Sequence, residues 1–567
     1  MSNLGSKSPL QHHPQARWIR IYILVTVGLF LLRVVIFAAH YGGIEHDSGW
    51  YLGVAKNLAH RGIYASYTNT IVREKKGVHP SIHNRLSVQD EDGFSYFPAG
   101  VTVGPGYVFP QALLIKIFGN GWWQYRLWPL ITYAGLLAVL FHIVWFLGGI
   151  WALVVMQVWL WAIPQLTTTF AYEAFSEHTA LFYLLISFLL FIKAWRRDGA
   201  YLYLFLTGFL LALAVLTKLL FGLTLLVFLC FALSDFLYSN LDIKRTCSRW
   251  TCVAVGFVLP IVLFELYRFE SLYYRFGIEG WQAVNEDIRL TFLYHGSGIK
   301  AFRSLCWPFI EEKLRLWSDV GIRPFWLLWL IFLSSPAVIA RSSRKGFRPL
   351  IMLIYGASMV NLLWFIGLSP LGWVRHAWHG LLLAMILISV VVGVLIHNRT
   401  SRLGKESYIL LLLVFLIIGL SLQRDKIEIN PFLDQETINK WKLTRRGNRG
   451  LPHAPVFSLA DQQDTMAFFL ENIRQEDRVY YEGWFLVAEM SPLVDRVFYP
   501  LARYYNNGFH NPEGGSSFLI FGPYQKGSSR MVPDWYLGAA ISQLCSNVVF
   551  TNPSYTICRL EQTLKKD

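Results

Sequence analysis

Long apolar stretches separated by short polar segments dominate residues 1–423 of the sequence. Several of these stretches approach the roughly 20 residues that an α-helix needs to cross a bilayer. We therefore expect a polytopic α-helical membrane protein. About eleven transmembrane helices are expected, at residues 21–39, 127–147, 149–165, 177–194, 201–217, 219–236, 250–267, 324–340, 350–367, 377–397 and 408–423.

The segment at residues 104–119 is also apolar, but we do not expect it to cross the membrane. It is short, Pro105 and Pro110 interrupt it, and Lys116 lies near its end. These features are typical of a helix that lies along the membrane surface with its apolar face towards the lipid.

Lysine and arginine residues gather in every second short loop, which indicates the orientation of the chain. They occur at residues 193–197, 244–249, 341–348 and 399–405. The opposite short loops contain only Lys218 and Arg375. Because basic loops stay in the cytoplasm, we expect a cytoplasmic N-terminus, large outer loops at residues 40–126 and 268–323, and an exoplasmic segment after the last span.

Residues 424–567 differ in pattern from the rest of the chain. Short runs such as RVYYEGWFLVAEM and NVVFTNPSYTICRL are rich in β-branched and aromatic residues and alternate with turn signals. We expect a small exoplasmic α/β domain there, following a transmembrane catalytic domain at residues 1–423. Cys545 and Cys558 would then lie in an oxidising compartment. A disulfide and two free buried thiols are equally compatible with the sequence.

Composition narrows the class of protein further. Of the 567 residues 54% are hydrophobic and 15% are charged, whereas soluble domains carry about 25% charged residues. The formal charge is +15, but the basic residues lie between apolar runs. Since a nucleic-acid partner requires a basic patch on a soluble face, none is expected. No cleavage site follows Lys7, Arg17 and Arg20, so we expect an uncleaved first helix.

An acidic cluster directly follows the first expected span, in the stretch GGIEHDSGWYLGVAKNLAHRGIYA. Its apolar side chains recur at helical spacing, at Trp50, Tyr51, Val54 and Leu58. This pattern predicts a helix along the membrane surface that begins near Asp47. A carboxylate in the first turn of such a helix is fixed in direction. It could take a proton from an acceptor hydroxyl while a lipid-borne group is attacked.

Several motifs, in this order, resemble those of the GT-C glycosyltransferases. HDSGWYLGVAKNLAHRGIYA is similar to the pattern D-E-x-Y-Y-x-x-x-A-x-x-L-x-x-x-G-Y, and GPGYVFPQALLIKIFGNGWWQYRLWPLI to the next motif of the family. AYEAFSEHTALFYLLISFLLF, GFLLALAVLTKLLFGLTLL and GWVRHAWHGLLLAMILI follow. The resemblance covers roughly residues 40–220 and 350–400. The nearest relatives look like the dolichyl-phosphate-mannose–protein mannosyltransferases and the bacterial aminoarabinose transferase for lipid A.

The resemblance implies an activity as well as a fold. Members of the family carry a sugar on a polyprenyl phosphate and transfer it from the outer leaflet to an acceptor, so membrane lipid surrounds the reaction. Asp47 matches the position of the catalytic base. Many members have a second acid at the next position, where this sequence has Ser48. Glu45 is a substitute two residues earlier. No cofactor is firmly implied, and a divalent metal is possible but is not favoured with Ser48 in place.

The leaving phosphate requires cations near the outer leaflet. Lys218 and Arg375 are the candidates that match family motifs, with a snorkelling lysine and an interfacial anchor as the alternative interpretations. His376, next to Arg375, is a further candidate for phosphate binding. Arg33 lies within the first span, where a charge is costly unless it is paired. It would contact either Asp47 or the phosphate, or else form a structural ion pair.

Three further residues are candidates for contacts with substrate. Glu177 matches an acidic position of the family at the start of the fourth span, where the helix dipole alone would also favour a carboxylate. We expect it to take part in catalysis by orienting the acceptor or the sugar. Glu173 lies beside it, and Tyr96 in the first outer loop could stack on a sugar ring.

The alternative function is a transporter or flippase of a lipid-linked or anionic substrate, because charges inside spans often mark a substrate path. Against it, the sequence contains no repeated pair of interrupted helices, and the candidate residues gather at the outer face. A non-catalytic scaffold would leave Asp47, Lys218 and Arg375 without a shared purpose. An oligosaccharyltransferase would carry a W-W-D-x-G motif, which is absent. The acceptor, whether lipid, glycan or protein, and the sugar are left open.

Overall fold

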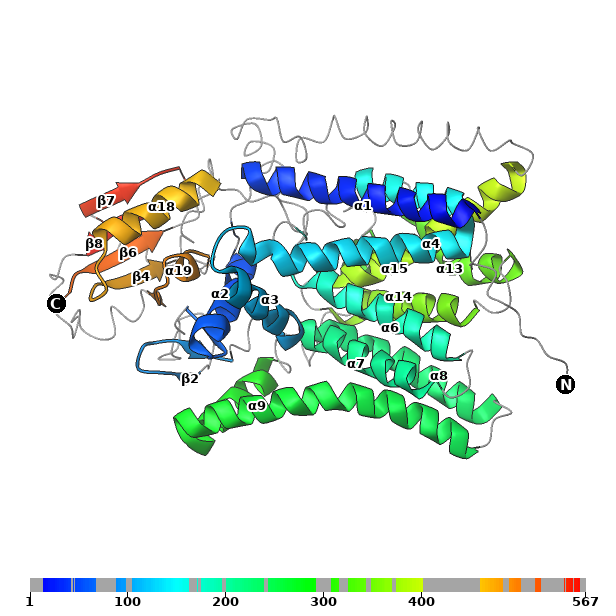
Figure 1. Ribbon diagram of the computed structural model, residues 1–567, viewed down its shortest axis with the longest axis horizontal. Coiled ribbons are helices and arrows are strands. Elements are labelled where there is room, and N and C mark those ends of the chain that lie inside the picture. The colour runs from blue at the N-terminus through cyan, green and yellow to red at the C-terminus, as the bar shows by residue number, and fades with distance from the viewer. Residues whose placement is uncertain are drawn as a thin grey trace.

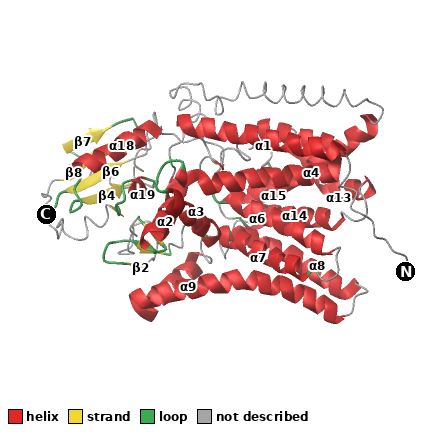
Figure 2. Cartoon of the chain, viewed as in Figure 1, coloured by secondary structure: helices red, strands yellow, loops and turns green. Residues whose placement is uncertain are grey.

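The computed structural model shows a bundle of long helices with a small sheet domain at one end (Figures 1 and 2). It describes residues 14–41, 44, 46–67, 88–97, 104–162, 171, 175–195, 200–238, 243–291, 307–315, 325–342, 348–369, 374–400, 459–482, 489–500, 515–521, 545, 547–553 and 555–560. We call the end of the bundle next to the sheet the domain end.

The bundle consists of α1 (Pro14–Tyr41), α4 (Leu127–Ala162), α6 (Glu177–Trp195), α7 (Tyr201–Thr217), α8 (Leu225–Tyr238), α9 (Ile243–Thr291), α13 (Phe325–Ser342), α14 (Arg348–Leu368) and α15 (Val374–Thr400). Among the described residues, 7 helical segments are long and apolar enough to cross a membrane, and α7 and part of α13 are shorter apolar helices. Each expected span up to residues 377–397 coincides with a helix or part of one. The span at 408–423 lies outside the described residues, so the total number of crossings stays a prediction.

Two of the long helices are interrupted by a glycine. Gly149 in α4 has φ 74° and Gly277 in α9 has φ 68°, a conformation that glycine adopts at little steric cost. Gly149 divides α4 into the two spans expected at residues 127–147 and 149–165. Beyond its expected span, α9 continues to Thr291, so the outer loop expected at 268–323 is partly helical and also contains α11 (Trp307–Leu314).

Burial identifies the centre of the bundle. In α15, 78% of the most apolar stretch is buried inside the protein, whereas the corresponding share in α9 is 17%. Thus α15 is surrounded by the other helices, and most apolar side chains of α9 are left to face lipid. The chain is an integral, multi-pass membrane protein.

The first outer loop supplies two short helices at the domain end. They are α2 (His46–Arg61) and α3 (Pro105–Phe118), accompanied by β1 (Ala65–Ser66), β2 (Val88–Gln89) and β3 (Ser95–Tyr96) in the order β1-β3-β2. Both helices lie at an angle to the long bundle helices (Figure 1). The sequence correctly predicted a helix beginning near Asp47 and a second helix within residues 104–119.

A five-stranded sheet forms the C-terminal domain. Its strands β4 (Arg478–Glu482), β5 (Tyr499–Pro500), β6 (Ser517–Phe521), β7 (Asn547–Thr551) and β8 (Thr556–Leu560) are arranged in the order β5-β4-β6-β8-β7. Strand β4 is parallel to β5 and β6, while β8 is antiparallel to β6 and β7. With α18 (Leu459–Asn472) and α19 (Met490–Leu493) it is the mixed α/β domain expected from the sequence. The boundary expected at residues 423 and 424 lies outside the described residues.

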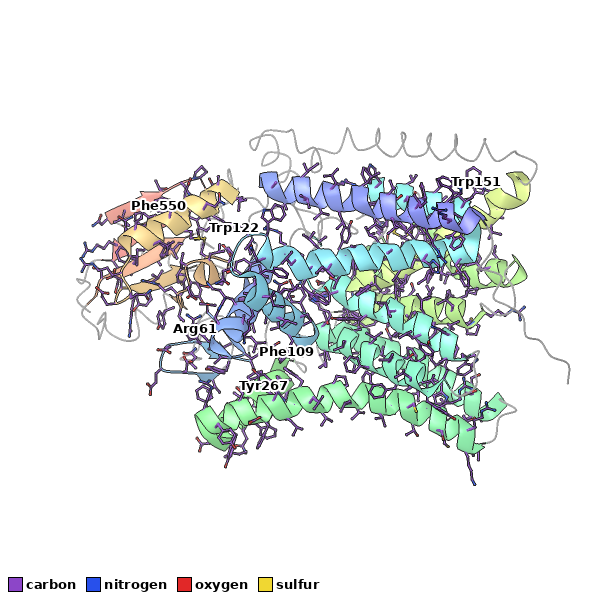
Figure 3. All side chains as sticks on the ribbon, in the orientation of Figure 1. Arg61, Phe109, Trp122, Trp151, Tyr267 and Phe550 are labelled. Atoms are coloured by element: carbon purple, nitrogen blue, oxygen red, sulfur yellow. A yellow bond between two sulfur atoms is a disulfide. The ribbon has the colours of Figure 1, made fainter. Side chains whose placement is uncertain are left out.

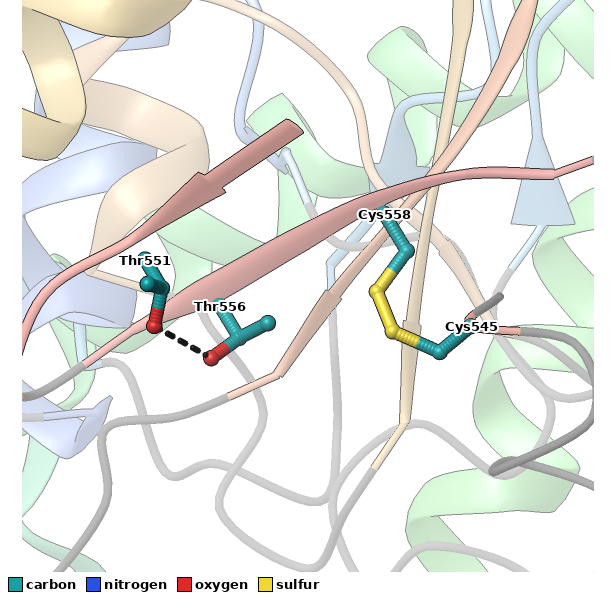
Figure 4. The surroundings of a disulfide bond; sticks show 4 residues. All are labelled: Cys545, Thr551, Thr556 and Cys558. Atoms are coloured by element: carbon teal, nitrogen blue, oxygen red, sulfur yellow. Dashed lines mark hydrogen bonds between the residues drawn. A yellow bond between two sulfur atoms is a disulfide. The ribbon is translucent and has the colours of Figure 1, made fainter. Parts of the chain in front are cut away.

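A disulfide joins the segment before β7 to β8. It links Cys545 to Cys558, with their Cα atoms 5.3 Å apart (Figure 4). The sequence was compatible with a disulfide and with two free buried thiols, and the structure shows the disulfide. It ties the edge strand β7 to the buried interior of the sheet, because Cys558 is fully buried.

Candidate functional site

Three charged side chains from distant parts of the sequence meet at one carboxylate oxygen. Glu177 Oε1 lies 3.0 Å from Lys218 Nζ and 2.7 Å from Arg375 Nε. The Glu177 side chain is 4% exposed, and the two cations are 13% and 15% exposed. We call these residues the ionic cluster. The cluster brings two cationic side chains together, and cations placed in this way suit the binding of an anion such as a phosphate.

Each member of the cluster is positioned by a helix end. Glu177 is the first residue of α6, where the positive end of the helix dipole favours a carboxylate. Lys218 has extended backbone angles, φ −148° and ψ 110°, and separates α7 from the short helix η3 (Leu219–Thr224). Arg375 is the second residue of α15, and its guanidinium lies 4.5 Å from the centre of the Phe175 ring.

The helix break at Lys218 is held from one side by the beginning of α3. A Cβ atom on Gly104 would lie 1.8 Å from the carbonyl oxygen of Leu216, and one on Gly106 would lie 2.4 Å from Oγ1 of Thr217. Only glycine allows the two backbones to approach this closely. The GPG stretch that opens α3 therefore packs directly against the two residues that precede Lys218.

The beginning of α15 and the end of α14 are held by polar side chains from neighbouring helices. Asn361 of α14 donates to the carbonyl of His376 at 3.1 Å and accepts from the amide of Gly380 at 3.0 Å. Lys313 of α11 is buried and donates to the carbonyls of Ser369 and Ile366 at 2.6 and 3.2 Å. Lys313 was not singled out from the sequence, because a lysine in an expected outer loop gives no signal of burial.

His376 adjoins the cluster on α15. Its ring centre lies 6.2 Å from that of Trp364, and its backbone carbonyl accepts the hydrogen bond from Asn361. His379, one turn later, stacks on Phe221 of η3 with ring centres 4.2 Å apart. The contact between His379 and Phe221 packs α15 against the segment that follows Lys218.

The helix that carries Asp47 approaches the ionic cluster through two tyrosines. Tyr51, one turn after Asp47 and hence on the same side of α2, lies 5.5 Å from Tyr107 of α3, measured between ring centres. Burial raises the pKa of Tyr107 well above its usual range; Tyr51 raises it further, Arg126 lowers it and the charge of Glu177 raises it. Tyr107 thus packs against α2 through Tyr51 and is close enough to Glu177 to be affected by its charge.

The remaining candidates occupy different positions. Glu45 and Glu173 lie outside the described residues, as do the side chains of His46 and Asp47. Arg33 donates from Nη1 to the backbone carbonyl of Trp161 at 3.2 Å, and its guanidinium lies 4.7 Å from the centre of the Trp161 ring. Its expected contact with Asp47 or with a phosphate stays a prediction.

Tyr96 lies within the protein rather than at its surface. Its side chain is fully buried, its ring centre is 5.1 Å from that of Phe276, and the guanidinium of Arg275 lies 5.4 Å from the ring centre. Both partners belong to the part of α9 that extends beyond its expected span. Stacking on a sugar would require this packing to open, and the role stays a prediction.

Within the described residues, no group of three His, Cys, Asp or Glu side chains could hold a metal ion. The side chains of Glu45, His46 and Asp47 are outside that search, so the expectation that a divalent metal is not favoured stays a prediction.

Solved structures with a similar fold belong to membrane glycosyltransferases. ArnT from Cupriavidus metallidurans, solved with bound undecaprenyl phosphate, is 14% identical and superposes with a TM-score of 0.52, covering 96% of this chain and 98% of that chain. The archaeal oligosaccharyltransferase AglB from Archaeoglobus fulgidus, solved with an inhibitory peptide and a dolichol-phosphate, is 11% identical with a TM-score of 0.50, covering 90% and 70%. The chain has the GT-C fold.

This fold confirms the architecture expected from the order of the sequence motifs. No protein-family model matches the sequence, and a comparison with curated proteins finds no significant match. The likeness to known GT-C proteins is thus one of three-dimensional arrangement, which extends over nearly the whole chain and includes the C-terminal domain.

Proposed function

We propose that this GT-C protein is a membrane glycosyltransferase that moves a sugar from a polyprenyl-phosphate carrier to an acceptor at the exoplasmic face. The observation that carries the proposal is the meeting of Lys218 and Arg375 at Glu177, at the same end of the bundle as the helix bearing Asp47. Donor phosphate and general base would thus lie at neighbouring places.

In the proposed reaction, an acceptor hydroxyl attacks the anomeric carbon of the sugar. The new bond joins the acceptor oxygen to that carbon, and the bond between the carbon and the phosphate oxygen breaks. Asp47 takes the hydroxyl proton, and the polyprenyl phosphate leaves with the bonding electron pair. Lys218 and Arg375 stabilise the charge on the departing phosphate. Glu177 holds both cations in place. This role is additional to the one expected from the motif, which is to orient the acceptor or the sugar.

The donor class is supported by what the two similar structures contain. ArnT was solved with undecaprenyl phosphate and AglB with a dolichol-phosphate, so polyprenyl phosphates are the ligand class that both share. The two cations of the ionic cluster suit the same chemical group. The acceptor is a hydroxyl-bearing group of a lipid, a glycan or a protein.

The experiment measures sugar transfer from labelled polyprenyl-phosphate donors in membranes that contain the wild-type protein or Asp47→Asn. Asp464→Asn, at an exposed position on α18, serves as the matched control. We expect the wild type to release polyprenyl phosphate, the control to do the same, and Asp47→Asn to lose at least about 10²-fold in rate, as is typical when a general base is removed.

The outcomes separate this function from its alternatives. Full activity of Asp47→Asn would exclude Asp47 as the base and direct the test to Glu45 and Glu177. A wild-type protein that turns over none of the donors, but moves a lipid-linked substrate across vesicles, would be a transporter instead.

A further inference from the structure

The C-terminal domain contacts the backbone directly in front of α2. The side chain of Gln462 on α18 accepts from the amide of Ile44 at 2.9 Å and donates to the carbonyl of the same residue at 2.8 Å. One side chain thus satisfies both backbone groups of Ile44, as a neighbouring β-strand would. All of these atoms are buried, and Ile44 lies only three positions before Asp47.

The two contacts with Ile44 determine the orientation of the Gln462 amide, and its nitrogen makes a further contact. Its nitrogen also donates to the hydroxyl of Tyr555 at 3.2 Å, and this hydroxyl in turn donates to Oε1 of Glu489 at 3.2 Å. With the amide reversed, its oxygen would face the Ile44 carbonyl and its nitrogen the Ile44 amide, so both contacts would be lost. Four buried residues of the domain and the loop therefore form one continuous chain of hydrogen bonds.

A second contact holds the other end of α2. Asp495 of the C-terminal domain accepts two hydrogen bonds from Arg61, from Nη1 to Oδ1 and from Nη2 to Oδ2, both at 3.1 Å. The Tyr67 hydroxyl donates to the same carboxylate, and Lys56 Nζ lies 3.4 Å from it. Lys56 also donates to the carbonyl of Pro492 at 2.7 Å. Figure 3 shows Arg61 at this boundary between α2 and the domain.

The local backbone around Asp495 is specialised for this contact. Asp495 has φ 55°, a left-handed conformation that Asp and Asn tolerate better than other non-glycine residues. Three residues later, Phe498 donates its amide to the carbonyl of Tyr67 at 3.1 Å. The turn after α19 thus engages both the end of α2 and the strand segment that follows it.

We propose that the C-terminal domain positions the base Asp47 by holding α2 at both ends, with Gln462 and Asp495 as the positioning residues. The inference rests on the proposed function for its catalytic consequence. The contacts of Gln462 and Asp495 at the two ends of α2, which we call the clamp, are a property of the fold. A displacement of a catalytic group by about 1 Å can cost on the order of 10²-fold in rate, so a loosened α2 lowers turnover even though neither residue touches substrate.

A role in positioning α2 and a role in binding the donor affect different kinetic constants. Arg375 lies on α15 and Lys218 lies between α7 and η3, so neither belongs to α2. Release of α2 should therefore lower kcat and leave the KM for the donor nearly unchanged. A general loss of folding would instead reduce the amount of active protein and leave the kinetic constants of the remainder as they were.

The test uses the full-length protein in lipid nanodiscs and three variants. Gln462→Met keeps a side chain of similar length and removes the amide, while Asp495→Asn keeps a residue that tolerates the left-handed backbone and removes the charge. Glu476→Gln is the matched control, since Glu476 pairs at the surface with Arg474 at 3.7 Å. Hydrogen exchange of the amides of residues 46–61 is measured first, and donor kinetics second.

We expect faster hydrogen exchange throughout α2 in both clamp variants and an unchanged exchange rate in the control. In the clamp variants kcat should fall about 10-fold or more, while the KM for the donor stays within about twofold of the wild-type value. Unchanged exchange in both variants would refute the clamp, whatever the activity. Faster exchange at unchanged kcat would refute the positioning role. If the wild type transfers no sugar, the proposed function fails, while the exchange data still decide whether the domain holds α2.

Discussion

Arg375 and Glu177 are 198 positions apart in the sequence, and the arginine Nε donates to the glutamate Oε1 at 2.7 Å. The contact joins the first turn of α15, the most buried helix of the bundle, to the first turn of α6. A buried charge is costly unless it is paired, and here one carboxylate pairs with two cations. The position of each cation therefore depends on Glu177.

Replacement of Glu177 by Gln should destabilise the protein more than replacement of either cation. It removes the charge of the buried carboxylate that both Lys218 and Arg375 contact, and breaking a buried pair in this way costs about 3 kcal/mol or more. The double variant Glu177→Gln with Lys218→Met should recover part of the loss, because one of the two cations is gone. Thermal unfolding in detergent measures the difference; a double variant no more stable than Glu177→Gln would contradict the charge argument.

Removal of a donor-binding cation should weaken donor binding more than turnover. For Arg375→Gln and for Lys218→Met we expect the KM for the polyprenyl-phosphate donor to rise roughly 10- to 100-fold, since a hydrogen bond to a charged group is worth about 1.5–3 kcal/mol. Arg375→Lys should retain only part of the wild-type affinity for the donor, because lysine cannot reproduce the planar, forked geometry of a guanidinium. A donor KM equal to that of the wild type would remove these residues from the phosphate site.

A methyl group at Gly104 should disturb both folding and donor binding. Its Cβ would lie 1.8 Å from the Leu216 carbonyl, so α3 or the turn before Lys218 must move, and overpacking of this kind costs about 1–3 kcal/mol. Gly28→Ala on α1 is the control, since nothing lies within 4 Å of its Cβ position. The thermal midpoint and donor KM of both variants are compared. Equal values for Gly104→Ala and wild type would contradict the close approach.

The disulfide should stabilise the C-terminal domain and report on the topology. Its loss in Cys545→Ser or Cys558→Ser should lower the stability of the domain by about 2–4 kcal/mol, measured as faster cleavage by a protease that acts on unfolded segments. In cells, the bond should form only if the domain faces an oxidising compartment. A fully reduced pair in freshly isolated protein would contradict the exoplasmic placement proposed for this domain.

The contact between Asp495 and α2 should persist to acidic pH. Burial raises the pKa of Asp495, but the hydrogen bonds from Arg61 and Tyr67 and the charge of Lys56 outweigh it and lower the pKa to about 2. A carboxylate with a lowered folded-state pKa stabilises the fold above its unfolded pKa of about 3.9, and this contribution is lost as the pH falls towards 2. The stability difference between wild type and Asp495→Asn should thus be constant from pH 8 to 5 and shrink below pH 4. A difference that already shrinks between pH 7 and 5 would contradict this assignment.

Much of the fold was predictable from the sequence because local patterns dictate it. Apolar runs located the bundle helices, and the spacing of Trp50, Tyr51, Val54 and Leu58 predicted that α2 would begin near Asp47, as it does at His46. The GPGYVFPQALLIKIFG stretch predicted α3. What local patterns missed is the length of α9, which remains helical through Thr291, beyond the apolar run on which the expectation rested.

The candidate site was predictable only in part. Glu177, Lys218 and Arg375 could each be named from the sequence, because each matches a motif of the GT-C resemblance and the expected outer short loops contain no other basic residue. Their common contact could not, since it depends on how α6, α7 and α15 pack. Gln462 and Asp495 gave no signal at all: a glutamine and an aspartate in a polar segment are ordinary surface residues until the tertiary structure brings them to α2.

Sequence by itself thus determined which segments are helices, where the membrane-embedded part is, and which charged residues are unusual there, because each of these follows from the free energy of transferring a short segment between water and lipid. Tertiary structure alone decided that one carboxylate joins two cations and that the C-terminal domain contacts both ends of the helix of Asp47. These contacts join residues that are distant in the sequence, and only side-chain packing and hydrogen-bond geometry specify them.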